Sequence, residues 1–239
     1  KLKSVLFIML YSIVLFAAFL AITSCKKNVI GTIVEPNRLN LYRYLVELRS
    51  QCTPLCGGVI ISPRHVLTAA HCVADQDPRD LTITAGITEL FEANGDIRDV
   101  FAAIIHSGYK HGLIVNDVAI LTLQKPLDVT KYTVAKLPKV GENFEGSIVD
   151  VAGWGNTNKL TYGYFIVEEN QACYRPSQLC VTPFPGIATY PGDSGSPVVL
   201  RRGNDVVLVG VVSGMIHTGQ QQANHAVAKI AHLSSSLRT

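Results

Sequence analysis

The segment Pro191–Pro197, with the sequence PGDSGSP, is the most informative stretch of the chain. Glycines on both sides of the pair Asp193-Ser194 can leave one serine hydroxyl exposed among converging backbone N–H groups. A serine hydroxyl becomes an effective nucleophile at neutral pH when a base takes its proton and hydrogen-bond donors stabilise the oxyanion. Ser194 is therefore a candidate nucleophile, which requires a histidine, a carboxylate and a pocket elsewhere in the chain.

Two other segments offer the missing side chains. His71 lies in the sequence LTAAHC, and Asp117 lies in the sequence NDVAIL. Taken singly, each has an ordinary structural explanation: a hydrogen-bonded histidine, a turn carboxylate and, for Ser194, a turn serine. Their joint occurrence in the order His, Asp, Ser favours a catalytic triad, because unrelated folds with the same triad chemistry use other chain orders.

These segments together resemble the chymotrypsin-type (trypsin-like) serine proteases from about Val29 to the C-terminus. The resemblance implies peptide-bond hydrolysis with Ser194 as nucleophile, His71 as general base and Asp117 as the carboxylate that orients the imidazole. It also implies an all-β fold of two antiparallel six-stranded Greek-key barrels with a short C-terminal helix.

The same resemblance assigns supporting roles to neighbouring residues. The backbone N–H groups of Gly192 and Ser194 are expected to form the oxyanion hole, and Ser213 is expected to hydrogen-bond the buried aspartate. Asp193 is expected to pair with a new N-terminal ammonium group at Val29, released by proteolysis. Val29 follows Asn28 and not the usual Arg or Lys, which leaves the activating enzyme open.

The pattern of short apolar runs agrees with a β fold. Each run has strand length and the connections carry Gly, Pro, Asn and Asp, which is typical of antiparallel barrels or sandwiches. The predicted strands are Tyr42–Leu48, Gly58–Ile61, His65–Ala69, Leu81–Ala85, Val100–Ile105, Val118–Leu123, Ile148–Ala152, Gln178–Thr182, Pro197–Leu200 and Val206–Ser213. Only Ala226–Leu237 has helical spacing, and it predicts a terminal helix.

The N-terminal segment reads as a leader, because Lys1 and Lys3 precede an apolar run from Val5 to Ile22. The alternatives are a retained membrane anchor or a lipobox, Ile22–Cys25, with Cys25 lipidated. The expected organisation is a signal peptide over residues 1–24, a propeptide or anchor segment over residues 25–28, and a protease domain over residues 29–239 with halves of roughly residues 29–135 and 136–239. The protein is expected to be secreted or, alternatively, anchored to a membrane through Cys25.

Charge and composition narrow the classes of partner. The chain has 239 residues, 48% of them hydrophobic, and a formal net charge of +3. Removal of residues 1–28 takes away four lysines and no acidic residue, which changes the net charge to −1. The sequence has no basic patch with interleaved aromatic residues, which would indicate nucleic-acid binding. It also has no glycine-rich phosphate loop, which would indicate a nucleotide cofactor. The expected partners of this monomer are polypeptide substrates and protein inhibitors.

The six cysteines of an exported chain are interpreted first as disulfides, and their spacing fits no common zinc site. No metal or cofactor is expected. The resemblance implies the pairs Cys56–Cys72 and Cys173–Cys180, whereas Cys52 either pairs with Cys25 or is free. Two disulfides common in the family are missing: Val149 and Leu200 replace one pair, which could meet as an apolar contact, and Tyr190 and Gly219 replace the other.

The specificity pocket is predicted from the alignment with the family. Ala188 is expected at its floor, where members that cleave after Arg or Lys have an acid. Met215 and His225 are expected where the pocket walls usually have glycine, so the pocket should be narrow and prefer small or medium apolar residues. The alternative to an active protease is a catalytically silent homologue of the family that acts as a binding protein.

The calcium-binding loop of some family members is not expected, because Ile87 stands where that loop would supply its first carboxylate. Glu89, Glu92 and Asp96 are then expected to be solvated charges.

Overall fold

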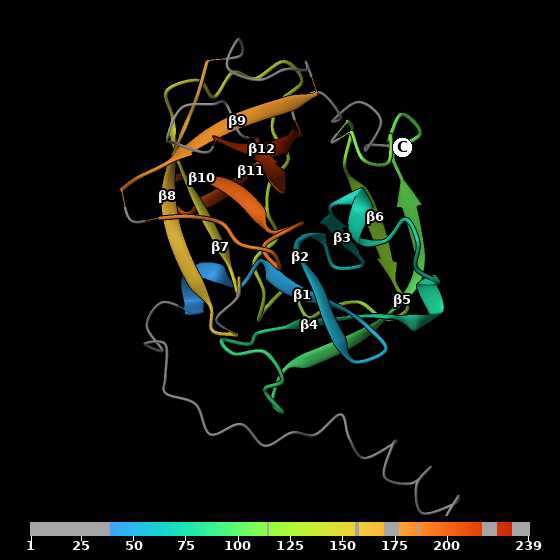
Figure 1. Ribbon diagram of the computed structural model, residues 1–239. Helices are drawn as coiled ribbons and strands as arrows, with labels where there is room; N and C mark the ends of the chain where they lie inside the picture. The colour runs from blue at the N-terminus through green and yellow to red at the C-terminus, as the bar shows by residue number, and fades with distance from the viewer. Residues whose placement is uncertain are drawn as a thin grey trace, which may run out of the picture.

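A computed structural model of the chain describes residues 39–113, 115–155, 158–169, 177–185, 187–216 and 224–230, with the backbone alone at residues 215, 216, 224 and 225. Its twelve described strands form two closed barrels that lie side by side (Figure 1). The first barrel contains β1 (Leu45–Ser50), β2 (Thr53–Ser62), β3 (His65–Thr68), β4 (Leu81–Ala85), β5 (Asp96–Ile105) and β6 (Ala119–Leu123). The second contains β7 (Ile148–Gly153), β8 (Thr161–Val167), β9 (Gln178–Pro183), β10 (Pro197–Arg202), β11 (Asp205–Ile216) and β12 (Asn224–Lys229).

The strand order of the second barrel, when it is followed from β7 back to β10, repeats that of the first barrel. It runs β1-β2-β3-β6-β5-β4 in the first and β10-β11-β12-β9-β8-β7 in the second, and every strand pair is antiparallel. Three short 3₁₀ turns complete the described elements: η1 (Asn40–Tyr42), η2 (Ala70–Cys72) and η3 (Pro78–Asp80). The predicted pair of six-stranded antiparallel barrels is therefore confirmed.

The chain crosses between the barrels at Ala135 and Lys136. The Ala135 N–H donates to Ile60 O on β2, whereas the Lys136 N–H donates to Val206 O on β11. Residues on the two sides of this peptide bond are thus attached to different barrels.

Strand β8 was absent from the predicted set. Gly163, Phe165 and Val167 alternate toward the barrel interior, as a strand requires. The outward positions, however, hold Tyr162, Tyr164 and Ile166, which are all apolar or aromatic and at least 36% exposed. Both faces of β8 therefore carry apolar or aromatic side chains, and the hydropathy alternation of a half-buried strand is missing from it.

The predicted terminal helix over Ala226–Leu237 is wrong in its first part. Residues 226–229 belong to strand β12, which pairs with β11 on one side and β9 on the other. Barrel closure supplies backbone hydrogen-bond partners on both edges and buries Ala226, Val227 and Ala228, and this outweighs the weak helical preference of the segment. Residues 231–237 lie outside the described part of the chain.

Apolar side chains fill both barrels and the space between them. Leu48, Ile83 and Leu121 belong to the cluster inside the first barrel. Val149 and Phe165 belong to the cluster inside the second, and Leu200 packs against the same cluster. Val149 and Leu200 also follow the antiparallel register of β7 with β10, which pairs Val198 with Val151 and Val199 with Asp150, so they lie in neighbouring strands where the resemblance implied a lost disulfide.

A third cluster joins the barrels. It combines Leu45, Val59 and Leu67 of the first barrel with Trp154 and Leu208 of the second, and all five side chains are buried. This continuous apolar interface fixes the relative position of the two barrels, and the candidate site lies along its edge.

The Cys56–Cys72 disulfide joins β2 to η2 across a sequence separation of 16 residues. Cys180 is also disulfide-bonded, but its predicted partner Cys173 lies outside the described residues, as does Cys25. Cys52 is an exposed free thiol in the turn between β1 and β2.

We expect the double replacement Cys56→Ala with Cys72→Ala to lower the free energy of unfolding by about 3 kcal/mol, the value typical of a loop of this length. Urea denaturation measures this difference. The replacement Cys52→Ala is the matched control and should change the free energy of unfolding by no more than about 0.5 kcal/mol, because that thiol is exposed and unbonded. Equal stability of the double variant and the control would contradict the structural role of the disulfide.

Candidate active site

His71 and Asp117 are joined by two hydrogen bonds, although they are far apart in sequence. His71 lies on η2, and Asp117 lies just before β6. The His71 backbone N–H donates to Asp117 Oδ1 at 2.8 Å, and the imidazole Nδ1 lies 2.7 Å from Asp117 Oδ2. These contacts fix both the position of the loop and the orientation of the ring, and they leave Nε2 for another partner.

Asp117 is nearly inaccessible to water, with an exposed fraction of 2%. Burial by itself raises its pKa, but hydrogen bonds from His71 and from the Ser213 hydroxyl outweigh burial and hold the pKa below its ordinary value. The carboxylate is therefore ionised at neutral pH. Ser213 lies on β11, so this contact also connects the histidine loop of the first barrel to the second barrel.

Ser194 is held between the two barrels by its own backbone. Its carbonyl oxygen accepts a hydrogen bond from Gly57 N at 2.7 Å, and the next N–H group, that of Gly195, donates to Val212 O at 2.7 Å. Gly57 follows Cys56, which is bonded to the neighbour of His71, and Val212 precedes Ser213. The loop of Ser194 is thus attached on one side next to His71 and on the other next to Ser213, the partner of Asp117.

Close approach of backbone explains two glycines at this point. A Cβ atom on Gly57 would lie 2.2 Å from Ser196 Oγ, and one on Gly195 would lie 2.3 Å from Thr68 Oγ1. Gly195 also has a φ of 75°, which side chains disfavour. Among the described side chains, no hydrogen bond links Ser194 Oγ to His71 Nε2, and in free enzymes this contact is often long until substrate binds.

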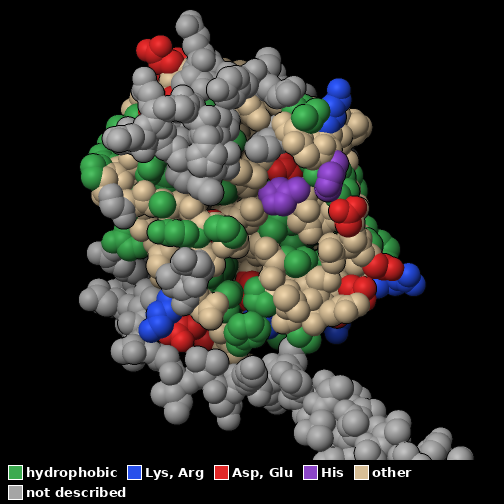
Figure 2. Space-filling model, in the orientation of Figure 1, with side chains coloured by type: hydrophobic (Ala, Val, Ile, Leu, Met, Phe, Trp, Pro, Cys, Tyr) green, Lys and Arg blue, Asp and Glu red, His purple; other side chains and the backbone are tan. Residues whose placement is uncertain are grey.

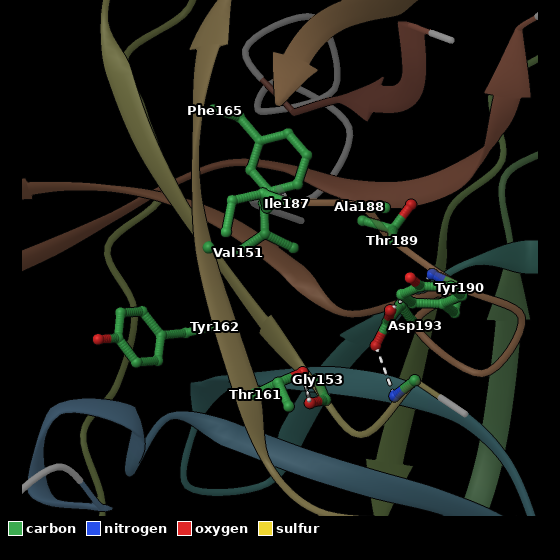
Figure 3. Close-up of a pocket in the computed structure, with 12 residues that line it drawn as sticks. Val151, Gly153, Thr161, Tyr162, Phe165, Ile187, Ala188, Thr189, Tyr190 and Asp193 are labelled. Carbon is green, nitrogen blue, oxygen red and sulfur yellow. Dashed lines mark hydrogen bonds between the residues drawn. The ribbon is translucent and has the colours of Figure 1, made fainter. Parts of the chain in front are cut away.

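Asp193 lines a cavity of about 180 Å³ in the second barrel (Figure 3). Its carboxylate accepts hydrogen bonds from Gly155 N and Tyr190 N, both at 2.8 Å. The side chain is buried, and burial raises its pKa above the ordinary value although the two amide donors act in the opposite direction. No Lys or Arg within the described ranges forms an ion pair with it.

Apolar side chains gather at one end of this cavity, and the hydroxyl-bearing residues Thr161 and Thr189 also line it. Val151 of β7, Phe165 of β8 and Ile187 face one another at the end opposite to Asp193 (Figure 3). Gly153 is required beside the carboxylate, because a Cβ atom there would lie 2.2 Å from Asp193 Oδ1. The cavity therefore presents one buried carboxylate, an apolar end and a few hydroxyl groups.

The three residues predicted for the specificity pocket are not brought together in one described cavity. Ala188 is exposed and lines the cavity that contains Asp193, which includes neither Ser194 nor His71. Met215 and His225 are register partners on β11 and β12, so their backbones are neighbours. Tyr190 is 49% exposed, and Gly219 and Val29 lie outside the described residues.

Glu89 and Glu92 of the loop between β4 and β5, and Asp96 at the start of β5, are not merely solvated charges, which corrects the prediction for them. The Glu92 carboxylate accepts hydrogen bonds from Thr88 N, from the Thr88 hydroxyl and from Glu89 N. Glu89 lies 3.6 Å from Lys159 Nζ, and Asp96 pairs with Arg98. Such short-range side-chain to backbone contacts have little sequence signal beyond an acidic residue a few positions after a threonine.

The described residues present one candidate metal-binding group and, on the face drawn in Figure 2, separate basic side chains. In the described part of the chain, the one group of side chains close enough to share a metal ion is Cys56, His71 and Cys72, but the two sulfur atoms form a disulfide and are not thiolate ligands. On the face in Figure 2, described Lys and Arg side chains lie at separate places and do not form a patch. No described helix has the length and apolar character needed to cross a membrane.

Comparison with known proteins gives a consistent result. The family model described as Trypsin matches residues 33–235. Chymotrypsin of Phaedon cochleariae is 31% identical over 202 residues, which cover 77% of this chain and 71% of the relative. Trypsin of Saccharopolyspora erythraea is 29% identical over 173 residues, which cover 66% of this chain and 74% of the relative.

A solved structure agrees with the sequence comparison. The scabies mite inactivated protease paralogue S-I1 superposes with a TM-score of 0.74 at 28% identity, covering 84% of this chain and 94% of the mite protein. The geometry of the site, the two barrels and the family match together give one conclusion: the chain belongs to the trypsin family of serine endopeptidases.

Proposed function

We propose that this chain is a secreted endopeptidase that cleaves polypeptides through an acyl-enzyme on Ser194. The Ser194 oxygen attacks the peptide carbonyl while its proton passes to His71 Nε2, and the imidazolium then protonates the leaving amine as the C–N bond breaks. Water, activated by His71 in the same way, releases the acyl group. The observation that carries this proposal is the buried Asp117 carboxylate, held by His71 and Ser213 beside the loop of Ser194.

The oxyanion hole of this proposal consists of the backbone N–H groups of Gly192 and Ser194. Gly192 has a φ of 103°, and a Cβ atom at this position would lie 2.8 Å from Gly155 O. A side chain at residue 192 is therefore disfavoured by both conformation and space, which supports a role for its exposed backbone.

Activation in this proposal requires cleavage before Val29. The new ammonium group would enter the cavity of Asp193 and form an ion pair with the carboxylate, whose two amide donors give it no full positive partner. The apolar residues of the cavity, among them Val151 and Ile187, suit the side chains of Val29 and Ile30.

We expect the Val29-terminated enzyme to lose activity as the pH rises above about 8. An α-amino group has an ordinary pKa near about 7.7–8.0, and pairing with Asp193 raises this pKa in the active form. The stabilisation is therefore complete below the ordinary pKa and is lost as the pH rises through the raised one. The measurement is kcat/KM against pH, combined with N-terminal sequencing. Asp193→Asn should be weakly active at every pH. Full activity of a chain that retains residues 25–28 uncut would contradict this activation.

The proposed specificity is for small or medium apolar residues before the scissile bond. None of the described residues 187–190 is acidic, so nothing in that segment compensates a buried cation from a substrate Arg or Lys. Met215 and His225, on adjacent strands where the family usually has glycine, would narrow the pocket further.

A peptide library that varies the residue before the cleaved bond tests this specificity. We expect Ala, Val or Leu to give kcat/KM at least about tenfold above Arg or Lys, because a charge buried without a partner costs more than a methylene gains. Dominant cleavage after Arg or Lys would show that Ala188 is not at the pocket floor.

Export of the enzyme through residues 1–24 is also part of the proposal, with Cys25 either in a short propeptide or carrying a lipid. Partition of the protein into detergent that is abolished by Cys25→Ser would establish the lipid anchor. Retention in the aqueous phase would exclude the lipid anchor and leave Cys25 in a short propeptide.

A further inference from the structure

The outer face of β8 carries an exposed apolar patch. Its three outward side chains, Tyr162, Tyr164 and Ile166, are each at least 36% exposed. Ile148 of β7 is the register partner of Ile166 and is 56% exposed. The Phe184 N–H donates to Tyr164 O at 3.1 Å, which places a further exposed aromatic residue beside the strand. These five residues are called the β8 face below.

The patch is continuous and large. The Tyr162 and Tyr164 rings meet edge to face, with their centroids 6.0 Å apart. Because a fully buried aromatic side chain covers about 150–250 Å², the exposed parts of three rings and two isoleucines together reach about 300 Å² or more. The largest apolar patch of a soluble protein commonly has this size and is often an interaction surface. The β8 face is therefore a candidate contact surface.

The middle of the β8 face has no net charge. Asp150 is the register partner of Tyr164 on β7, but its carboxylate is buried. It lies 2.9 Å from Nη2 of Arg201, which neutralises it. The guanidinium of Arg201 in turn lies over the Tyr42 ring, 5.2 Å from its centroid, and does not form a separate basic site. An identical surface can therefore approach the middle of the face without repulsion between like charges.

The two ends of β8 carry opposite charges. Lys159 and Glu169 lie five residues before and five residues after Tyr164, and Glu169 is exposed. The Lys159 side chain is 39% exposed, and its Nζ lies 3.6 Å from Glu89, a contact of the exposed kind that contributes little. If two β8 strands lie antiparallel about a two-fold axis at Tyr164, Lys159 of each copy approaches Glu169 of the other. The charges of the strand are thus complementary to those of a second copy.

The architecture determines how a second copy can bind. The second barrel is closed, so a partner cannot extend its sheet and must pack face to face. Packed sheets lie about 10 Å apart with their strands within about 30° of each other, which is within reach of Lys and Glu side chains at the ends. β8 lies on the side of the second barrel away from β6, the strand that follows Asp117 (Figure 1). A copy on the β8 face therefore leaves the candidate active site open.

We propose that the β8 face is the contact surface of a homodimer, in which two copies pack antiparallel about a two-fold axis at Tyr164. A stable interface covers about 800 Å² on each partner, with an apolar centre and a polar rim. The β8 face supplies the centre, and Lys159 and Glu169 belong to the rim. The homodimer replaces the monomer expected from the sequence, and it does not depend on the proposed endopeptidase function.

Sedimentation equilibrium of the full chain as it is exported measures the dimer directly. We expect twice the mass of one chain, with a dissociation constant of about 1 µM or tighter, the weak end of the range for interfaces of standard size. The mass of one chain at concentrations up to about 100-fold above this constant would overturn the proposal. A monomer that binds phosphatidylcholine vesicles through Tyr164 would also overturn it, because lipid would then cover the face.

Tyr164→Lys places two like charges at the two-fold axis and should weaken the dimer at least about 100-fold. Phe101→Lys is the matched control, because Phe101 is 72% exposed on β5 of the first barrel, and it should leave the dissociation constant unchanged. Ile148→Lys, also on the β8 face, should weaken the dimer as well and serves if Tyr164→Lys does not fold. A dimer that persists in both β8 variants would show that another surface forms the interface and would overturn the proposal.

A charge exchange tests the antiparallel arrangement. Glu169→Lys and Lys159→Glu, each made alone, should weaken the dimer about tenfold, because each brings like charges together at both ends of the interface. The two replacements made together in one chain should restore the dissociation constant to within about threefold, since opposite charges then face each other again. Additive weakening in the double variant would contradict the two-fold axis at Tyr164.

Discussion

Replacement of Ser194 by alanine is expected to lower kcat about 10⁶-fold, the loss typical of removing the nucleophile of a serine protease triad. Alanine has no oxygen to form the acyl-enzyme, so the residual rate comes from substrate binding and the oxyanion donors. The measurement is kcat on the best library peptide, with enzyme purified free of wild-type protein.

Ser196→Ala is the matched control in the same loop. The Ser196 hydroxyl is buried without a hydrogen-bond partner among the described residues, so its removal should leave kcat nearly unchanged. The double variant Ser194→Ala with His71→Ala should be no slower than Ser194→Ala alone, because the two side chains act as a unit. Additive losses, or an active Ser194→Ala enzyme, would contradict the assigned roles.

Asp117→Asn is expected to lower kcat about 10⁴-fold while the fold is retained. An asparagine NH₂ group beside His71 Nδ1 would donate where the carboxylate accepts, which places the imidazole proton on Nε2 and prevents it from taking the Ser194 proton. Replacement of the exposed Asp99 by asparagine changes the charge equally and should leave kcat unchanged. A loss of less than about tenfold in Asp117→Asn would contradict the orienting role of Asp117.

The free energy of unfolding in acid gives a second, independent test of the role of Asp117. Because the hydrogen bonds to Asp117 hold its pKa below the ordinary value, its ionised form stabilises the folded protein above the ordinary pKa of an aspartate. That stabilisation is lost as the pH falls through the lowered pKa. Asp117→Asn should therefore reduce the dependence of unfolding free energy on pH in acid, whereas Asp99→Asn should not.

The parts of the fold that the sequence predicted are short apolar runs bounded by turn residues. Leu81–Ala85 forms β4 with the predicted bounds, and its side chains alternate between the core and a half-exposed position only near its start. Strand β8 was not predicted; its sequence TYGYFIV contains Gly163, and an isolated glycine weakens a strand pattern. Strand β12 was predicted as helix, because the partners that make it a strand are contributed by β9 and β11.

In the candidate site, the residues could be predicted from the sequence, but most of the contacts that hold them could not. His71 and Asp117 were predicted from short local motifs and Ser213 from the family resemblance, and the structure joins them by hydrogen bonds. The contacts that hold the site together were not predictable, since Gly57 N to Ser194 O and Gly155 N to Asp193 link backbone atoms from distant segments. Backbone groups are the same at every residue, so the sequence carries little information about which of them pair.

Reaction with a fluorophosphonate probe tests the central claim most directly. The purified protein that begins at Val29 is incubated with the probe, and the modified peptide is identified by mass spectrometry. The proposed mechanism predicts one covalent adduct, on Ser194, that is absent in Ser194→Ala and strongly slowed in His71→Ala. A folded, Val29-terminated protein that forms no adduct would contradict it and would identify the chain as a catalytically silent binding protein with a protease fold.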